Sequence, residues 1–125
     1  MTKYLIIILF TLTLTSVAKS DSYMENIFKG CISFNEWNRT NKAPEDQIEI
    51  ISALMCKSFI WGFLLGSDAQ YETYPDVVKG CSDEVYHPDN LSKLLVKFLQ
   101  ENPNYFTKPS EEIMIKMFET NFPCK

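Results

Sequence analysis

The most reactive side chains in this 125-residue chain are four cysteines, Cys31, Cys56, Cys81 and Cys124. They form no Cys-x-x-Cys pair, and His87 is the single histidine, so the set does not have the ligand spacing of a zinc site. An even number of cysteines is typical of disulfide bonds when a chain is exported, and residues 1–18, described below, predict export. We therefore expect two disulfides, no metal and no other cofactor.

The sequence offers no recognisable set of catalytic residues. A serine or cysteine nucleophile needs a base beside it, and His87 lies in a Tyr-His-Pro-Asp turn where a solvated or helix-capping role is expected. The carboxylate pairs Asp83–Glu84 and Glu111–Glu112 are adjacent in sequence and therefore point in different directions. No glycine-rich phosphate loop or calcium loop is present. The sequence predicts that the protein is not an enzyme.

Residues 1–18 predict a signal peptide. Lys3 supplies a positive charge, residues 4–14 are apolar residues and threonines, and residues 16–18 (Ser-Val-Ala) have the small-x-small pattern that signal peptidase recognises. The apolar run is shorter than the roughly 20 residues of a membrane-spanning helix, which disfavours a retained membrane anchor. We expect cleavage after residue 18, or after Ser20, and one domain over residues 19–125.

Composition limits the classes of partner. Twelve basic and sixteen acidic residues leave a formal net charge of −4, and the basic residues are scattered singly. Phosphate binding depends on clustered lysine and arginine, so we exclude nucleic acid as a partner. An apolar content of 46% is ordinary for a globular core and argues against intrinsic disorder.

Apolar residues recur at helical spacing in four segments, and no stretch alternates as a strand does. The first predicted helix covers residues 21–29 and stops at Gly30, with a loop at 32–43. The second begins at Pro44 and carries an apolar stripe wide enough for burial on more than one side. Its members are Ile48, Ile51, Leu54, Met55, Phe59, Ile60, Trp61, Phe63 and Leu64.

Two glycines in the second helix, Gly62 and Gly66, are expected to serve close helix packing. A membrane dimer motif is disfavoured because Glu49 and Lys57 lie in the same helix.

The third and fourth helices have the clearest boundaries. The third is capped at Asp89 or Asn90 and ends at Asn102, since the residue before Pro103 avoids helical angles. The fourth opens at Pro109 and stops near residue 121. We therefore expect an all-α protein, a small domain of four, or four to five, helices stapled by two disulfides.

The order of these segments suggests a disulfide pairing. A connection of about eight residues between the last two helices favours an antiparallel hairpin, which brings Cys81 and Cys124 to the same end. Cys31 and Cys56 would then form the other bridge. Four cysteines allow three pairings, and the other two stay open.

The long connection at residues 67–88 is the first candidate for partner binding. A connection of more than about 15 residues is usually functional or disordered, and Cys81 within it argues against disorder. Tyr71 and Tyr74 offer aromatic anchors, and Glu72 and Asp76 offer acidic neighbours. A solvated loop with tyrosines folded onto the core is an equally open alternative.

Two stretches resemble the Rap/Tai-type immunity proteins, which protect bacteria from amidase toxins delivered by type VI secretion. Residues 56–66 (CKSFIWGFLLG) resemble that family's cysteine–helix–glycine element. Residues 94–124 resemble it more specifically: a helix with the sequence LLVKFL, an Asn-Pro step, and a second helix ending in Asn-Phe-Pro-Cys. The resemblance covers about residues 27–124. The differences from the family pattern fall in the loops. Members of the family usually have a proline shortly after the third cysteine, whereas Ser82 follows Cys81 here.

The resemblance implies a periplasmic, all-helical protein, often a homodimer, with no stable membrane anchor. Such a protein plugs the cleft of a cognate peptidoglycan amidase and occludes its catalytic cysteine without chemistry of its own. We expect residues 67–89 to supply the contacts. The alternatives are a periplasmic acid-stress chaperone, which exposes apolar surface at low pH, and another small exported helical binding protein.

Overall fold

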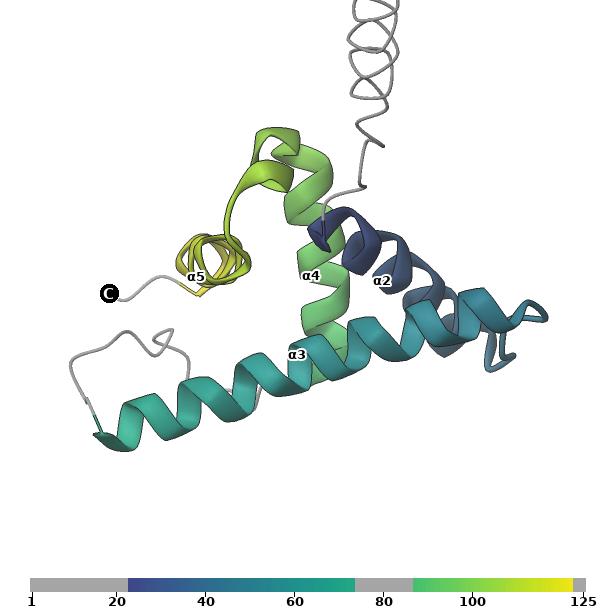
Figure 1. The fold of residues 1–125 in the computed structure, drawn as a ribbon, viewed down its shortest axis with the longest axis horizontal. Helices are drawn as coiled ribbons and strands as arrows, with labels where there is room; N and C mark the ends of the chain where they lie inside the picture. The colour runs from purple at the N-terminus through teal and green to yellow at the C-terminus, as the bar shows by residue number, and fades with distance from the viewer. Residues whose placement is uncertain (1–22, 74–86, 123–125) are drawn as a thin grey trace, which may run out of the picture.

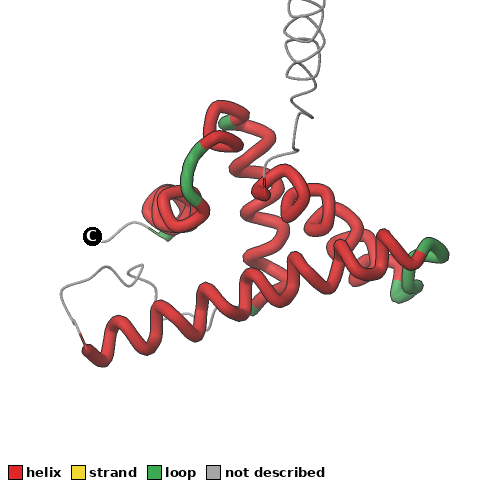
Figure 2. Tube along the Cα trace, in the orientation of Figure 1, coloured by secondary structure: helices red, strands yellow, loops and turns green. Residues whose placement is uncertain are grey.

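The computed structural model of the chain describes residues 23–73 and 87–122, with side chains described only to residue 66 in the first range. The regular structure in these ranges is entirely helical (Figures 1 and 2). This confirms the predicted all-α class with four α-helices. The elements are α2 (Tyr23–Thr40), α3 (Gln47–Thr73), α4 (Pro88–Glu101), the short 3-10 helix η1 (Pro103–Thr107) and α5 (Ser110–Asn121).

The longest helix, α3, forms the base on which the others are arranged (Figure 1). Helix α2 packs most extensively against α3, and α4 packs against both. Figure 1 shows α4 running from top to bottom in the plane of the view and α5 nearly end-on, so these two helices cross steeply. The predicted antiparallel hairpin is wrong, because η1 begins directly after the end of α4 and redirects the chain before α5 starts.

All four α-helices contribute to one apolar core. Its centre consists of side chains with at most 1% of their surface exposed, drawn from every helix. They are Ile27, Cys31, Ala53, Cys56, Ile60, Leu91, Leu95, Leu99, Ile113, Met114 and Met117. Burial of this kind contributes about 1.5–3 kcal/mol for each large aliphatic side chain, before the cost of ordering the chain.

Helix α2 does not stop at Gly30 but continues to Thr40, so the predicted loop at 32–43 is also wrong for most of its length. Gly30 is buried, and it does not have a positive φ. A Cβ atom there would overlap the carbonyl oxygen of Ser52, so this glycine lets α2 and α3 approach closely. The helix ends instead at Thr40, and the next residue, Asn41, has a left-handed φ of 55°.

Helix α3 begins at Gln47, three residues after the predicted Pro44. The Ile48 amide donates a hydrogen bond to the Asp46 carboxylate at 3.1 Å, which caps the helix. Helix α3 then continues to Thr73, so the first seven residues of the predicted 67–88 connection are helical. They contain no glycine or proline, and their alanine, glutamine and glutamate favour helix.

The last two helices follow the prediction closely. Helix α4 ends at Glu101, before Asn102, and α5 ends at Asn121. Only the cap of α4 differs, since His87 occupies the position predicted for Asp89 or Asn90.

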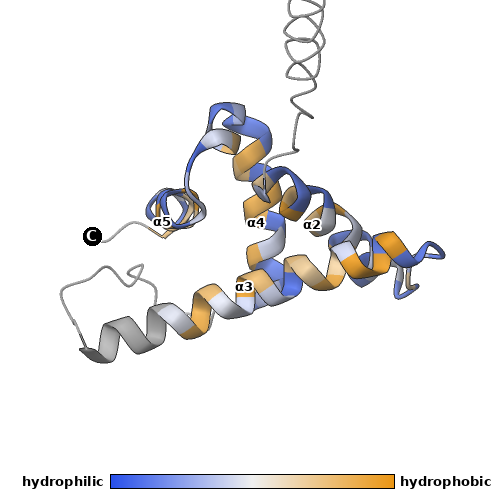
Figure 3. Cartoon of the chain, in the orientation of Figure 1, coloured by the Kyte–Doolittle hydropathy of each residue, from blue (hydrophilic) through white to orange (hydrophobic). Residues whose placement is uncertain are grey.

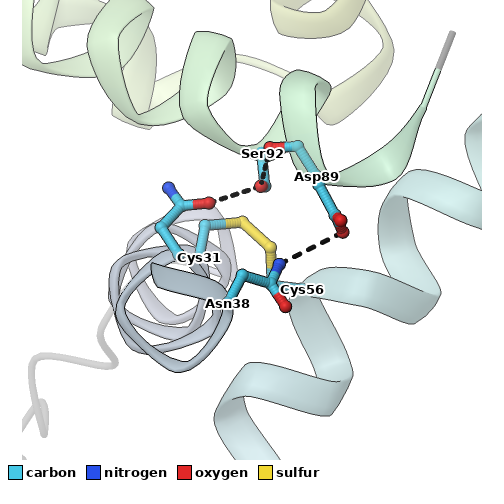
Figure 4. Close-up of a disulfide and its surroundings, with 6 residues drawn as sticks. Cys31, Asn38, Cys56, Asp89 and Ser92 are labelled. Carbon is cyan, nitrogen blue, oxygen red and sulfur yellow. Dashed lines mark hydrogen bonds between the residues drawn. A yellow bond between two sulfur atoms is a disulfide. The ribbon is translucent and has the colours of Figure 1, made fainter. Parts of the chain in front are cut away.

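One disulfide, Cys31–Cys56, joins the middle of α2 to α3 (Figure 4). Its Cα atoms are 5.0 Å apart and both cysteines are fully buried, so the bridge is part of the core. This pairing is confirmed. Cys81 and Cys124 lie outside the described residues, as does the predicted signal peptide with Ser20.

We expect Gly30→Ala to lower the free energy of unfolding by about 1–3 kcal/mol, because α2 and α3 must separate to admit the methyl group. The control is Gly66→Ala in α3, where no described atom lies within 4 Å of the added Cβ. That substitution should change stability by less than about 1 kcal/mol. Urea unfolding followed by circular dichroism measures both. Equal effects would contradict the close approach.

We expect Cys31→Ala with Cys56→Ala to lower the free energy of unfolding by about 3–4 kcal/mol, because the bridge closes a 25-residue loop in the unfolded chain. The same urea titration measures the loss. Peptide mapping of the oxidised wild type should recover residues 31 and 56 in one cross-linked peptide. Recovery of either cysteine linked to position 81 or 124 would contradict this pairing.

Candidate functional site

The four residues predicted to contact a partner lie at or beyond the end of α3. Tyr71 and Glu72 belong to its last helical turn rather than to a loop. Tyr74 and Asp76 lie outside the described residues. The structure thus places Tyr71 and Glu72 on a helix. That the four side chains form one partner-binding surface stays a prediction.

His87 has the predicted helix-capping role. Its Nδ1 atom accepts a hydrogen bond from the Asp89 amide at 3.4 Å at the start of α4. The same nitrogen lies 3.5 Å from the Asp89 carboxylate, and about two-thirds of the histidine side chain is exposed. Among the described residues, no group of three or more histidine, cysteine or acidic side chains could hold a metal ion.

The start of α4 is also tied to α2 by polar contacts (Figure 4). The Asn38 side-chain amide donates a hydrogen bond to the Asp89 carboxylate at 3.1 Å. The fully buried Ser92 hydroxyl donates to the side-chain oxygen of Asn35, and it also lies 3.0 Å from the Asp89 carbonyl. These contacts satisfy a buried polar group and fix how α4 sits on α2.

The most prominent surface is a row of apolar side chains on α3 that the rest of the described chain does not cover. It consists of Ile48, Ile51, Leu54, Met55, Trp61 and Leu65, which are 44–72% exposed. We call this row the α3 face. Figure 3 shows hydrophobic residues recurring along this helix, well beyond its crossings with α2 and α4.

The α3 face corrects the prediction that this helix is buried on more than one side. The buried positions, Ala53, Cys56 and Ile60, lie on one side only. Sequence reasoning therefore missed the face as a candidate binding surface. The signal for an exposed face was the width of the apolar stripe on α3, because the helices packed on one side of α3 cover only part of so wide a stripe.

No charged residue belongs to the α3 face. Between Gln47 and Gly66 the charged residues are Glu49 and Lys57, and at 100° per residue both fall on other sides of the helix. Within the face lie Ser58 and Gly62, which are small and exposed. The predicted close packing at Gly62 and Gly66 is not seen, since no described atom lies within 4 Å of a Cβ built on either.

The segment Gln47–Gly66 is long and apolar enough to span a membrane by length and composition, with a mean hydropathy of 1.7. Only 17% of it is buried, less than in the core helix of a soluble protein. However, α2 lies along it, and the exposed side of α2 carries Glu36 and Arg39. A bilayer could not surround α3 without also taking up these charges, which disfavours a membrane span.

Two of the grooves among the described residues lie between α-helices. A polar groove between α2 and α4 holds Glu36 and Arg39, whose side chains form two hydrogen bonds of 2.9 and 2.5 Å. Hydrogen bonding from Arg39 lowers the pKa of the Glu36 carboxyl, so both groups are ionised and each is the other's hydrogen-bond partner. An apolar groove between α3 and α5, with a volume of about 320 Å³, opens beside Gly62. Only the second groove adjoins the α3 face.

No family model, curated protein or solved structure matches the chain. The fold and the surfaces define a class: a small all-α protein, braced by a disulfide between its two longest helices, with an exposed apolar helix face.

We expect His87→Ala to lower the free energy of unfolding by about 1 kcal/mol, because the α4 amide loses its side-chain acceptor. His87→Asn should retain most of the stability, since asparagine is a favourable N-cap residue. Thermal unfolding of the two variants measures the difference. Equal midpoints for alanine and asparagine would contradict the capping role.

Proposed function

We propose that this protein is an exported immunity protein that binds a cognate peptidoglycan amidase toxin and occludes its active site in the periplasm. The observation that carries the proposal is the correspondence between the resembling motif and the structure. The helix over residues 88–101 ends at the Asn-Pro step, and the last helix ends at Asn121, where the motif places these features. Leu95, Phe98 and Phe118 of the motif pack in the core.

A rigid scaffold suits inhibition by occlusion. A binding segment that is held in place before contact loses less conformational entropy on binding than a free one. The buried Cys31–Cys56 bridge and the α2–α3 contact hold α3 in place, and Tyr71 and Glu72 lie in the last turn of this helix. Tyrosine supplies apolar area with a polar tip, which favours a role as an anchor in a partner's cleft.

The inhibitor would contribute no chemistry. Its side chains would fill the toxin's cleft. They would exclude substrate from the catalytic cysteine by steric occlusion alone. Glu72 and Asp76 would add electrostatic complementarity to a basic cleft rim, which affects the association rate and the choice of partner more than the total affinity.

The test begins with the genes that neighbour the one encoding this chain, where the proposal predicts a small cysteine–histidine amidase. That amidase is then expressed in the periplasm of a bacterial host, and protection of the host is measured. We expect wild type to restore growth, and expect Tyr71→Ala, Tyr74→Ala, Glu72→Lys and Asp76→Lys combined to abolish protection, because the anchors and their charges are removed. Purified amidase should bind wild type and not the variant. Circular dichroism must show that the variant is folded.

The matched control reverses two exposed acidic residues elsewhere, Glu101→Lys and Glu112→Lys, which tests charge alone. This control should still protect. Full protection by the combined variant would remove residues 71–76 from the interface. Absence of any binding between the wild type and the amidase would overturn the proposed function.

The exposed α3 face favours one second candidate, an acid-stress chaperone, because chaperones bind unfolded clients through apolar surface. The hydrogen bond with Arg39 lowers the pKa of Glu36, so this exposed pair adds a little stability above the unfolded pKa of Glu36. That contribution is lost as the pH falls through the folded pKa. A chaperone should loosen and bind many clients below about pH 3, where carboxylates are protonated. An immunity protein should bind one partner tightly at neutral pH.

A further inference from the structure

The α3 face is larger and more uniform than the apolar patches that most monomers leave in water. With roughly 200 Å² for a side chain of this size, six side chains exposed to 44–72% leave about 600 Å² of apolar surface. That value lies at the upper end for the largest patch on a monomer. It is also a large part of the ~800 Å² that each partner buries in a standard interface, so the face is large enough to bind another protein.

The spacing within the face is that of a contact between two helices. Positions 48, 51, 55, 58, 62 and 65 are separated by alternating steps of three and four residues, which is the pattern of anchors where one helix packs along another. Glu49 and Lys57 fall outside this seam, so a helix laid along it buries neither charge. The face therefore accepts the apolar stripe of a second helix.

Near the middle of the seam, the surface is hollowed on the side toward α5. The apolar groove between α3 and α5 opens there, because two of the α3 residues beside it are small. It is lined by Ser58, Phe59, Gly62, Phe63, Ser110 and Glu111. Its volume of about 320 Å³ lies at the lower end of the ~300–1,000 Å³ of ligand pockets. A groove of this size suits one bulky apolar side chain of a partner.

The two edges of the face carry opposite charges. Glu111 lies at the groove, on the edge toward α5. Lys57 lies on the other edge, about 40° around the helix from Trp61. Both charged residues are exposed. A complementary helix carries a basic residue beside the groove and an acidic residue on the far edge, and such charges govern orientation and the choice of partner.

We infer that the α3 face and the α3–α5 groove together bind an amphipathic helix of a partner protein. The apolar stripe of that helix lies along the seam, and one bulky apolar side chain near its middle enters the groove beside Gly62. A basic residue next to this side chain pairs with Glu111. Helix binding in an apolar groove commonly uses anchors with this spacing.

A second copy of α3 or a lipid surface fits these features less well. An antiparallel two-fold pair of α3 helices brings the Glu111 edges of both copies together, which sets like charges against each other. A parallel pair sets Gly62 against Gly62 and leaves the groove unfilled, so its lining loses contact energy. A bilayer that covered the groove would have to take up the Glu111 carboxylate.

This inference does not rest on the proposed function, since it uses only the exposure, spacing, groove and charges of α3 and α5. The site lies apart from residues 71–76. It also differs from chaperone activity, because the folded protein binds one helix at neutral pH rather than many unfolded clients in acid.

The first experiment uses a fluorescent synthetic peptide of about 20 residues, long enough to form a helix in water. It has leucine at the seam positions, one central phenylalanine, a lysine beside it and glutamates on the far edge. Fluorescence polarisation at pH 7 measures its binding to the oxidised mature protein without toxin. We expect a dissociation constant of about 10 µM or lower, and a loss of at least about tenfold when alanine replaces the phenylalanine. A scrambled peptide of the same composition should not bind.

The second experiment fills the groove. Gly62→Leu should weaken binding at least about tenfold, because the added side chain occupies the space that the phenylalanine enters. The matched control is Gly66→Leu, which makes the same change in the same helix away from the groove. No described atom lies within 4 Å of a Cβ built at either glycine, so both variants should fold. Gly66→Leu should bind the peptide as wild type does.

The third experiment reverses the charge at the groove. Glu111→Lys should weaken binding of the lysine peptide by about threefold and should favour a peptide with glutamate in place of that lysine. The matched control is Glu119→Lys, which reverses an exposed charge on α5 outside the groove. That variant should keep the wild-type preference for the lysine peptide.

Four results would overturn the inference. They are no binding of the peptide by the wild type, equal binding of the alanine and phenylalanine peptides, a wild-type dimer that the peptide does not dissociate, and partition onto phosphatidylcholine vesicles that the peptide does not prevent. The alanine peptide keeps the test valid if Gly62→Leu does not fold, since it needs no variant protein. Because no experiment includes toxin, their failure leaves the proposed function untouched, and a failed protection assay leaves this inference untouched.

Discussion

The close contact between α2 and α3 is the constraint on which the rest of the structure depends. Gly30 brings the two backbones together at the Ser52 carbonyl, and the Cys31–Cys56 bridge one residue later locks that approach. Helix α4 then packs against both helices, and its start is fixed to α2 by Asn38 and Ser92. A larger residue at position 30 would separate α2 from α3 and misplace both the bridge and α4.

The same constraint accounts for the exposed surface. With α2 and α4 both held on one side of α3, the described chain has nothing left to cover the other side. The apolar residues there cost free energy in water, so their number and charge-free pattern indicate a surface that another protein covers. The α3 face and the pair Tyr71 and Glu72 lie at different places along the same helix, so they are separate features of one scaffold.

Local signals predicted a large part of the fold. The Asn102-Pro103 step and the periodicity of Leu91, Leu95 and Phe98 fixed α4, and they act over a few residues. Gly30 misled the prediction because the residue type alone does not distinguish a glycine that ends a helix from one that lets a neighbouring helix approach closely. The steep crossing of α4 and α5 was also not predictable, because it depends on the 3-10 geometry of η1.

By itself, the sequence determined that the chain is helical, where its last helices end, and that Cys31 and Cys56 suit one bridge. The sequence also supplied the candidate contact residues Tyr71, Glu72, Tyr74 and Asp76, and the structure adds only that the first two are helical. Only the tertiary structure decided which side of α3 is covered. Periodicity shows that a helix has an apolar side, but contacts between segments far apart in sequence determine whether that side faces the core or the solvent.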